Sequence, residues 1–382
     1  MQSVQPEFQE VGHSGGKVIF HVVTREDGRR SYQITWQSDR PVPTALFAIY
    51  ALPQGLPVAP LPLGGIGQPW PAPPFPGCVP VFIASDSEGM FGHQCPACDG
   101  YWRSRGPSLT CPYCNIHAGQ HDFLTTAQRS YVQQYCDMLN DALADEKDGD
   151  HIIDMDAVAD AVRATEKPAF YYTEESQQHH LACRHCGSVT DILGKFGYCS
   201  VCGTRNDLQE LEEKTIPELR ARINGGGPYE ACVKDAVAAF DSLAGLYVRQ
   251  LVQRVPMTPS RKGRIAKMRF HNLQVVAAEL KSTFDIDILG GMRAEEIEFA
   301  TLLFHRRHVY EHKGGEADEK YIADSGDVSV RPKQALHETQ QSAHQLATLI
   351  VKLATNLHRG FHDIFPPDQG PIKTHAKRNA RS

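Results

Sequence analysis

The sequence predicts a multidomain protein of the α+β class, in which β-rich and cysteine-rich segments precede an all-helical block. Three observations predict this arrangement. Residues 1–90 contain short apolar runs separated by prolines and glycines, a pattern typical of β-strands. Residues 91–208 contain two cysteine frames of identical spacing. Residues 228–365 carry apolar side chains at three- and four-residue steps, which indicates amphipathic helices around a shared core.

Size and composition restrict the classes of function. At 382 residues the chain is long enough to form several cores. Its net charge of −6 gives no global attraction to nucleic acid, so any RNA contact needs local basic patches. No apolar run is long enough to span a bilayer, and the first residues lack the plan of a signal peptide. We therefore expect a cytoplasmic protein, whose cysteines bind metal rather than form disulfides.

Strands are expected to build the N-terminal module, residues 1–90. A β-hairpin is predicted over residues 17–37, with its turn at Glu26-Asp27-Gly28. Further strands are predicted over residues 45–51 and 79–84. The proline-rich stretch between these two strands excludes a helix and a central strand. The sequence does not indicate what this module does.

Eight of the eleven cysteines fall into two frames of the form Cys-x2-Cys-x12-Cys-x2-Cys. Each Cys-x2-Cys pair supplies two thiolates from one tight turn, and two such turns complete a tetrahedral metal site. The spacing predicts two zinc ribbons, over residues 91–120 and 168–208, each with one structural Zn²⁺ and no catalytic metal. Iron is the alternative ion. The predicted ligands are Cys95, Cys98, Cys111 and Cys114 in the first ribbon, and Cys183, Cys186, Cys199 and Cys202 in the second.

The ribbons have two interpretations. A closed tetrathiolate site leaves no open coordination position, so the simpler interpretation is structural. Alternatively, ribbon side chains contact nucleic acid or a protein. The candidates for such contacts are Tyr101, Trp102, Arg103, Arg105, Arg184 and His185. The remaining cysteines, Cys78, Cys136 and Cys232, are expected to be small buried apolar groups.

The segments around the ribbons are expected to connect domains. Helices are predicted over residues 126–144 and 154–165, within a helical spacer (121–167) that packs the ribbons together. A short strand over residues 169–172 leads into the second ribbon. Residues 209–227, which end in three glycines, are expected to be a linker. The basic tail, residues 366–382, is expected to be disordered.

The helical block, residues 228–365, is predicted to form an up–down bundle of four helices. Their expected ranges are 233–255, 271–283, 294–313 and 336–361. The third helix is apolar nearly all round at its centre, which predicts burial. It ends in the run Arg306-Arg307-His308-Val309-Tyr310-Glu311-His312, shortly before Gly314 and Gly315. A guanidinium that keeps its charge and an imidazole that titrates near neutrality thus lie at the end of a buried helix.

The pattern Arg-(Asn/His/Asp)-x3-His, from Arg307 to His312, resembles the signature of the HEPN superfamily of helical ribonucleases. The resemblance extends over the helices from about Tyr229 to Phe365. It implies a metal-independent endoribonuclease, in which a 2′-hydroxyl of RNA attacks the adjacent phosphate and leaves a 2′,3′-cyclic phosphate. In that chemistry His312 transfers a proton and Arg307 stabilises charge on the phosphorus. Arg306, His308 and Glu311 are the candidates for positioning the substrate or the catalytic pair.

The resemblance also implies a homodimer, because HEPN relatives build one composite site between two motifs. It further implies a toxin or an effector of antiphage defence, activated by a regulatory protein or a nucleic-acid trigger.

On an ideal helix Arg307 and His312 are about 140° apart around the axis. The two side chains therefore converge only if the helix loosens at its end, or if two copies face each other.

Other interpretations of the helix end stay open. Arg and His at a helix end are also a common solvated cap, and His305, His308 and His312 share one face that is an alternative metal site. The competing function is a non-catalytic zinc-ribbon RNA-binding or adaptor protein that dimerises through a HEPN-like bundle.

A basic cluster between the first two helices is predicted to bind RNA phosphates beside the site. Its members are Arg261, Lys262, Arg264, Lys267 and Arg269.

Overall fold

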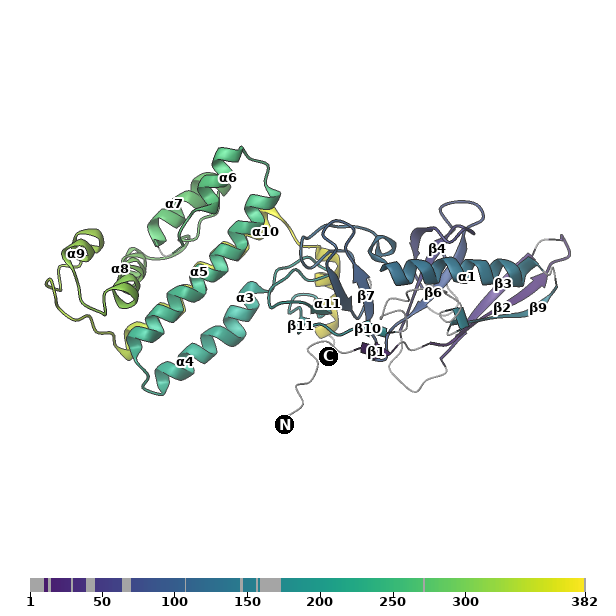
Figure 1. Cartoon of the computed structure of the whole chain (residues 1–382), viewed down its shortest axis with the longest axis horizontal. Helices are drawn as coiled ribbons and strands as arrows, with labels where there is room; N and C mark the ends of the chain where they lie inside the picture. Colours follow the sequence, from purple (N-terminus) through teal and green to yellow (C-terminus); the bar gives the residue numbers. More distant parts are fainter. Residues whose placement is uncertain are drawn as a thin grey trace. The chain divides into compact units, whose positions relative to one another are not determined.

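The structure, a computed structural model, describes residues 10–12, 15–28, 30–38, 45–63, 70–106, 108–144, 147–155, 157–158, 173–270 and 272–380. The chain forms two compact units (Figure 1). The first unit contains residues 1–205 together with residues 368–382, and the second contains residues 206–367. The end of the chain therefore belongs to the first unit.

The predicted hairpin is confirmed, and it is part of a three-stranded antiparallel sheet. β2 (Lys17–Thr24) pairs with β3 (Arg30–Gln37) on one side and with β9 (Gly149–Asp154) on the other. The turn uses Gly28 at φ 75°, a conformation that glycine adopts without strain. β9 was not predicted, because its six residues contain only two apolar side chains.

A second three-stranded sheet confirms the other two predicted strands. β4 (Leu46–Ala51) lies between β5 (Pro57–Leu61) and β6 (Val79–Ala84). β5 was not predicted. It is an edge strand with two prolines, a position that tolerates the missing N–H donors.

Helix α1 (Thr126–Ala144) has the predicted bounds but not the predicted role. Its buried Val132, Tyr135 and Leu139 join the core formed by the two sheets. The helix therefore completes the N-terminal module, and the interpretation of residues 121–167 as a spacer between ribbons is wrong for α1. The predicted helix over 154–165 lies largely outside the described residues, and the predicted strand over 169–172 lies entirely outside them.

The two cysteine frames form one structure rather than two separate ribbon domains. β7 (Phe91–Gln94) and β8 (Tyr101–Ser104) come from the first frame, and β11 (His179–Ala182) and β12 (Val189–Ile192) come from the second. They form a single four-stranded sheet in the order β11-β12-β8-β7. β8 and β12 make the junction. Beside this sheet, β1 (Glu10–Gly12) pairs with β10 (Thr173–Glu175).

The second unit contains the predicted helices, with a different topology. α5 (Tyr229–Arg254) and α10 (Gln340–Ile364) pack against each other. Glu338 N donates to Glu230 Oε1 at their N-terminal ends, and Arg254 lies over the Phe365 ring at their C-terminal ends. The two helices are therefore parallel, whereas the first and last helices of an up–down bundle are antiparallel.

The predicted short helix over 271–283 is present, and a further short helix that was not predicted precedes it. α6 (Pro259–Ala266) and α7 (Leu273–Phe284) follow α5, and α8 (Ala294–His312) then runs antiparallel to it. α9 (Glu319–Ser325) packs on α8 before α10 begins. No helix of the described chain combines the length and apolarity needed to cross a bilayer.

Residues 209–227 are not a linker. Most of them lie in α3 (Asp207–Glu210), a π-helical turn (Leu211–Thr215) and α4 (Ile216–Asn224). α4 buries Ile216, Leu219 and Ile223, and it packs on α5 and α10. The spacing of these three apolar residues indicates a helix. The sequence analysis missed it because most residues of the segment are polar.

The tail also forms a helix, α11 (Gln369–Asn379), so the expectation of disorder is wrong. Asp368 N donates to the Cys202 carbonyl at 2.9 Å, and Ile372 packs against the second cysteine cluster. The His375 ring also lies against Gly187, so these contacts anchor the helix beside the second frame.

Candidate metal centres and candidate active site

Each cysteine frame gathers its four sulfur atoms into one cluster, as predicted, with all four within 4.8 Å of one another. In the first cluster Cys95 and Cys114 Sγ are 3.6 Å apart, and in the second Cys186 and Cys199 Sγ are 3.5 Å apart. Zn–S bonds of about 2.3 Å in a tetrahedron separate sulfur atoms by about 3.8 Å. The described clusters therefore fit a metal ion of this size.

Four equivalent backbone turns hold the sulfur atoms. The residue after each Cys-x2-Cys pair has positive φ: Asp99 and Asn115 at 58°, Gly187 at 71° and Gly203 at 73°. Each of these residues donates its backbone N–H to the carbonyl of the first cysteine of its pair. Asp, Asn and Gly are the residues that tolerate this conformation best. Glycine thus occupies both turns of the second frame, whereas Asp99 and Asn115 occupy those of the first.

The two frames are related by a local pseudo-twofold axis. Arg103 and Asp191 occupy the same place in the two frames, eight positions after the first cysteine, and they face each other across β8 and β12. The backbone repeats this symmetry: Thr110 N donates to the Ser200 carbonyl, and Tyr198 N donates to the Pro112 carbonyl. The pair of frames is therefore one closed unit with two metal sites.

A buried ion pair lies at the centre of this unit. The Arg103 guanidinium is fully buried and donates to Asp191 Oδ2 at 2.7 Å and to Asp86 Oδ2 at 2.7 Å. Burial raises the pKa of Asp86, and Arg103 opposes that shift. Trp102 is also fully buried, with its Nε1 donating to Ser108 Oγ. Trp102 and Arg103 are thus core residues and cannot contact nucleic acid, whereas Arg105 and Arg184 are exposed.

Helix α8 presents the Arg307–His312 motif in its last turns. Ala300, Leu303 and Phe304 bury the centre of the helix, as predicted. Gly314 and Gly315 have φ values of 63° and 87°, and Gly315 N donates to the Val309 carbonyl. The glycines thus end the helix directly after the motif.

Arg306 belongs to a buried network that holds the segment after α8. Its guanidinium donates to Asp327 Oδ2 at 2.9 Å and to Glu338 Oε1 at 3.1 Å. Tyr310 OH donates to the same Glu338 oxygen, and Tyr321 OH donates to the same Asp327 oxygen. Arg306 Nε also donates to Tyr321 OH at 3.2 Å, so Arg306 positions the segment that carries Tyr321, Asp327 and Glu338.

Arg307 and His312 lie on different sides of α8. Arg307 Nη2 pairs with Glu311 Oε2 at 2.6 Å, one turn further along. His308 and His312 form a separate pair, with ring centroids 4.8 Å apart and ring planes tilted by 56°, and both are exposed. The helix is α-helical through His312, which excludes convergence by a loosened helix end. Within one chain the motif residues therefore remain about 140° apart.

The exposed histidine pair lies in a cationic environment. Partial desolvation lowers the pKa of the exposed His308 side chain, and the positive charges of His312, Arg307, Lys313 and Lys320 lower it further. Lys320 lies on α9 and was missed by the sequence analysis, because no spacing rule connects it to the motif. No cluster that could hold a metal ion forms around His305, His308 and His312 in the described chain.

The basic cluster does not adjoin the motif. Pro228 and Lys234, at the N-terminal end of α5, line a pocket together with Tyr310 and Gly314. α6, which carries Arg261, Lys262 and Arg264, follows the other end of this 26-residue helix, whose length is about 39 Å. Arg264 also pairs with Glu279 at 2.9 Å.

Comparisons of the chain with models of protein families, with curated proteins and with solved structures find no match.

Proposed function

We propose that the protein is a metal-independent endoribonuclease of HEPN type, and that each four-cysteine cluster holds a structural Zn²⁺. The observation that supports the nuclease best is the end of α8. There His308 and His312 are exposed among the positive charges of Arg307, Lys313 and Lys320. Both histidines are part of α8, whose buried centre fixes their positions. Cations around an exposed imidazole suit an RNA phosphate that must be held while a proton moves.

The chemistry needs only groups that two copies of this helix provide. The 2′-hydroxyl attacks the adjacent phosphorus, the bond to the 5′-oxygen breaks, and a 2′,3′-cyclic phosphate and a 5′-hydroxyl result. His312 takes the hydroxyl proton, and His312 of a second copy delivers a proton to the leaving oxygen. Arg307 stabilises the charge on the five-coordinate phosphorus. DNA lacks the attacking hydroxyl and would not be cut.

The roles of the neighbouring residues follow from their contacts. Glu311 orients Arg307 through their 2.6 Å ion pair. The His308 ring lies against the His312 ring at a tilt of 56° and restricts the motion of His312. Arg306 shapes the loop that follows the helix and does not touch RNA, because Asp327 and Glu338 hold its guanidinium. Within one chain Arg307 and His312 face different ways, so the proposal requires a composite site between two copies.

A non-catalytic function is the second candidate: a zinc-ribbon RNA-binding or adaptor protein that dimerises through the helical unit. The observation that favours it is the Arg307–Glu311 pair, since a carboxylate at 2.6 Å neutralises the charge that the phosphate would need. The Arg103–Asp191 ion pair at the centre of the two frames also points to a structural role for the cysteine clusters.

One experiment separates the two candidates. RNA is incubated in chelator with the wild type, Arg307→Ala and His312→Ala. We expect the wild type to cut and both variants to lose activity by roughly a hundredfold or more, the scale of a lost proton-transfer or charge-stabilising group. Exposed residues of the same unit provide matched controls: Arg331→Ala and His337→Ala should cut like the wild type.

The ends of the products test the chemistry independently. A 3′-hydroxyl product would contradict attack by the 2′-hydroxyl. Equal cleavage by the wild type and both motif variants would assign the activity to another site. RNA binding without any cleavage would support the adaptor.

A further inference from the structure

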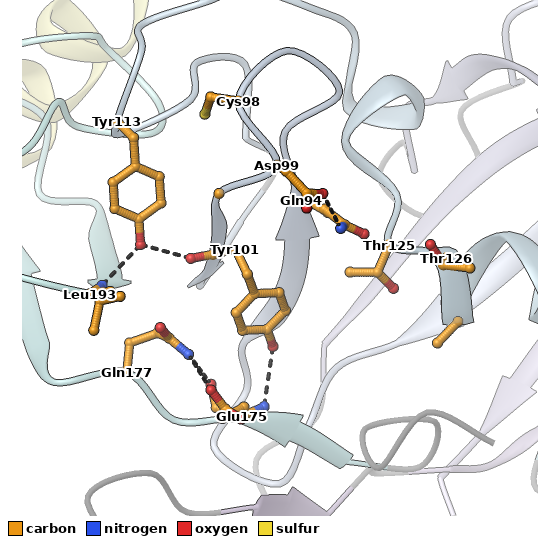
Figure 2. A pocket seen from close by; sticks show the side chains of 12 residues that line it. Gln94, Cys98, Asp99, Tyr101, Tyr113, Thr125, Thr126, Glu175, Gln177 and Leu193 are labelled. Atoms are coloured by element: carbon orange, nitrogen blue, oxygen red, sulfur yellow. Dashed lines mark hydrogen bonds between the residues drawn. The ribbon is translucent and has the colours of Figure 1, made fainter. Parts of the chain in front are cut away.

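We propose that a pocket beside the first cysteine frame binds an organic cation, an ammonium or guanidinium group. This binding site is separate from the proposed nuclease and does not depend on it. The pocket has a volume of about 770 Å³ and lies within the first unit (Figure 2). Its walls come from the turn between β7 and β8, the start of α1, and residues around β10 and the end of β12.

The charges of the pocket all have one sign. Asp99 and Glu175 line it, and no Lys, Arg or His of the described chain does. Neither carboxylate forms an ion pair with a described residue. Cys98 is also in the wall, and four thiolates around a divalent ion carry a net charge of about −2. A concave site with this charge attracts cations and repels RNA phosphates.

Neutral side chains hold both carboxylates in place. Gln94 Nε2 donates to Asp99 Oδ1 at 2.6 Å, and Gln177 Nε2 donates to Glu175 Oε1 at 3.3 Å (Figure 2). Each amide orients its carboxylate without cancelling the charge. The two carboxylates are therefore fixed acceptors before any ligand arrives, which reduces the ordering cost of binding.

Two tyrosine rings supply the apolar surface. Tyr113 OH donates to the Tyr101 carbonyl at 2.7 Å and accepts from Leu193 N at 2.9 Å (Figure 2). A Cβ on Gly100 would lie 2.4 Å from Tyr113 Cδ2, so only glycine lets this ring pack against the turn. Aromatic faces near carboxylates are the groups that recognise organic cations.

Titration by nuclear magnetic resonance of the full, metal-loaded chain tests the proposal. The probes are spermidine and agmatine, as free cations, and acetyl-Gly-Arg-Gly-amide, as a side chain of a protein. We expect shifts of the Tyr101 and Tyr113 resonances, and an affinity that falls with added salt. Binding of the peptide alone would identify a protein side chain as the ligand, and binding of the free cations alone would identify a small molecule.

Isosteric variants remove the charge and keep the shape. Asp99→Asn suits the positive φ of this position, and Glu175→Gln keeps the backbone contacts. Each should weaken binding by about tenfold, as expected for one charge-assisted hydrogen bond. Glu26→Gln, in the β2–β3 turn of the same unit, is the control and should bind like the wild type. Unchanged zinc content in all variants shows that the cysteine frames are intact.

Three results would overturn the proposal. One is the absence of shifts at both tyrosines with every cation tested. Another is equal binding of acetyl-Gly-Gly-Gly-amide, which has no charge. The third is binding of a single-stranded RNA oligonucleotide in this pocket, seen as shifts of the Tyr101 and Tyr113 resonances without any added cation. None of these results depends on the activity of the Arg307 and His312 variants.

Discussion

Single residues show how strongly burial changes the role of a charge in this protein. Arg103 and Arg105 are two positions apart, yet the first is fully buried between carboxylates and the second is exposed. The first lies within β8, whereas the second follows the end of that strand. A basic residue in a cysteine frame is therefore not by itself evidence for a nucleic-acid surface.

Arg103→Met should destabilise the first unit by about 3–5 kcal/mol, because it leaves two buried carboxylates without their partner. Denaturant unfolding followed by tryptophan fluorescence measures the effect, since all three tryptophans lie in this unit. Arg105→Met is the matched control and should change the free energy of unfolding by less than about 0.5 kcal/mol. Equal effects of the two substitutions would contradict the central role of the ion pair.

The histidines of α8 predict a dependence of stability on pH. Burial lowers the pKa of both His305 and His308 below the ordinary value of 6.5. The unfolded chain then binds protons that the folded chain does not, so stability falls as the pH drops below about 6.5. His305→Gln/His308→Gln should flatten this dependence in urea unfolding followed by circular dichroism at 222 nm. If the free energy of unfolding of the variant still falls between pH 7.5 and pH 5.5 as steeply as that of the wild type, the two histidines are not its cause.

At the scale of elements, replacing two glycines in long helices by alanine should change stability in opposite directions. A Cβ on Gly245 of α5 would meet its nearest atom, Phe270 Cε2, at 3.6 Å, whereas a Cβ on Gly360 of α10 would meet Ile286 Cγ2 at 2.8 Å. Gly245→Ala should therefore stabilise the helical unit by up to about 1 kcal/mol, through helix propensity. Gly360→Ala should destabilise it, because Ile286 must move. Urea midpoints from circular dichroism measure both changes, and effects of the same sign would contradict the packing.

The shared sheet predicts that the two metal sites depend on each other. Cys95→Ser removes one ligand of the first cluster, and we expect one metal ion per chain in place of two. Because β8 pairs with β12, the remaining ion should also leave faster when a coloured chelator is added. Cys78→Ser, at a buried cysteine outside both clusters, is the control. Release from the second site at the wild-type rate would show that the frames are independent.

At the scale of the whole molecule, the proposed site needs two copies of the chain. Arg307→Ala and His312→Ala chains are each expected to be inactive. After they are mixed and allowed to exchange, about half of the dimers pair one chain of each kind. Each mixed dimer keeps one intact Arg307 and one intact His312, and water must replace the second His312 in one proton transfer, so only part of the activity should return.

Light scattering establishes whether the chain is dimeric, and cleavage assays of the mixture measure the recovery. A dimer whose mixture stays inactive would contradict a site shared between copies. A strictly monomeric chain that cuts RNA would exclude the composite site altogether.

The sequence by itself determined the features that depend on local chemistry. Cysteine spacing identified all eight thiols of the two clusters, because a Cys-x2-Cys turn brings its sulfur atoms together wherever it occurs. Apolar periodicity found the hairpin of β2 and β3, α1 and the long helices, since a period of two or 3.6 residues reports one buried face.

Only the tertiary structure decided the features that depend on residues far apart in the chain. The joining of the two frames rests on Arg103 and Asp191, which are adjacent only because β8 and β12 pair. The parallel course of α5 and α10 depends on how the four helices between them, α6 to α9, pack, and their sequences do not indicate a direction. The docking of α11 uses Ile372, the His375 ring against Gly187 and the Asp368 backbone hydrogen bond. Such contacts leave no period in the sequence, because each depends on where a distant segment lies.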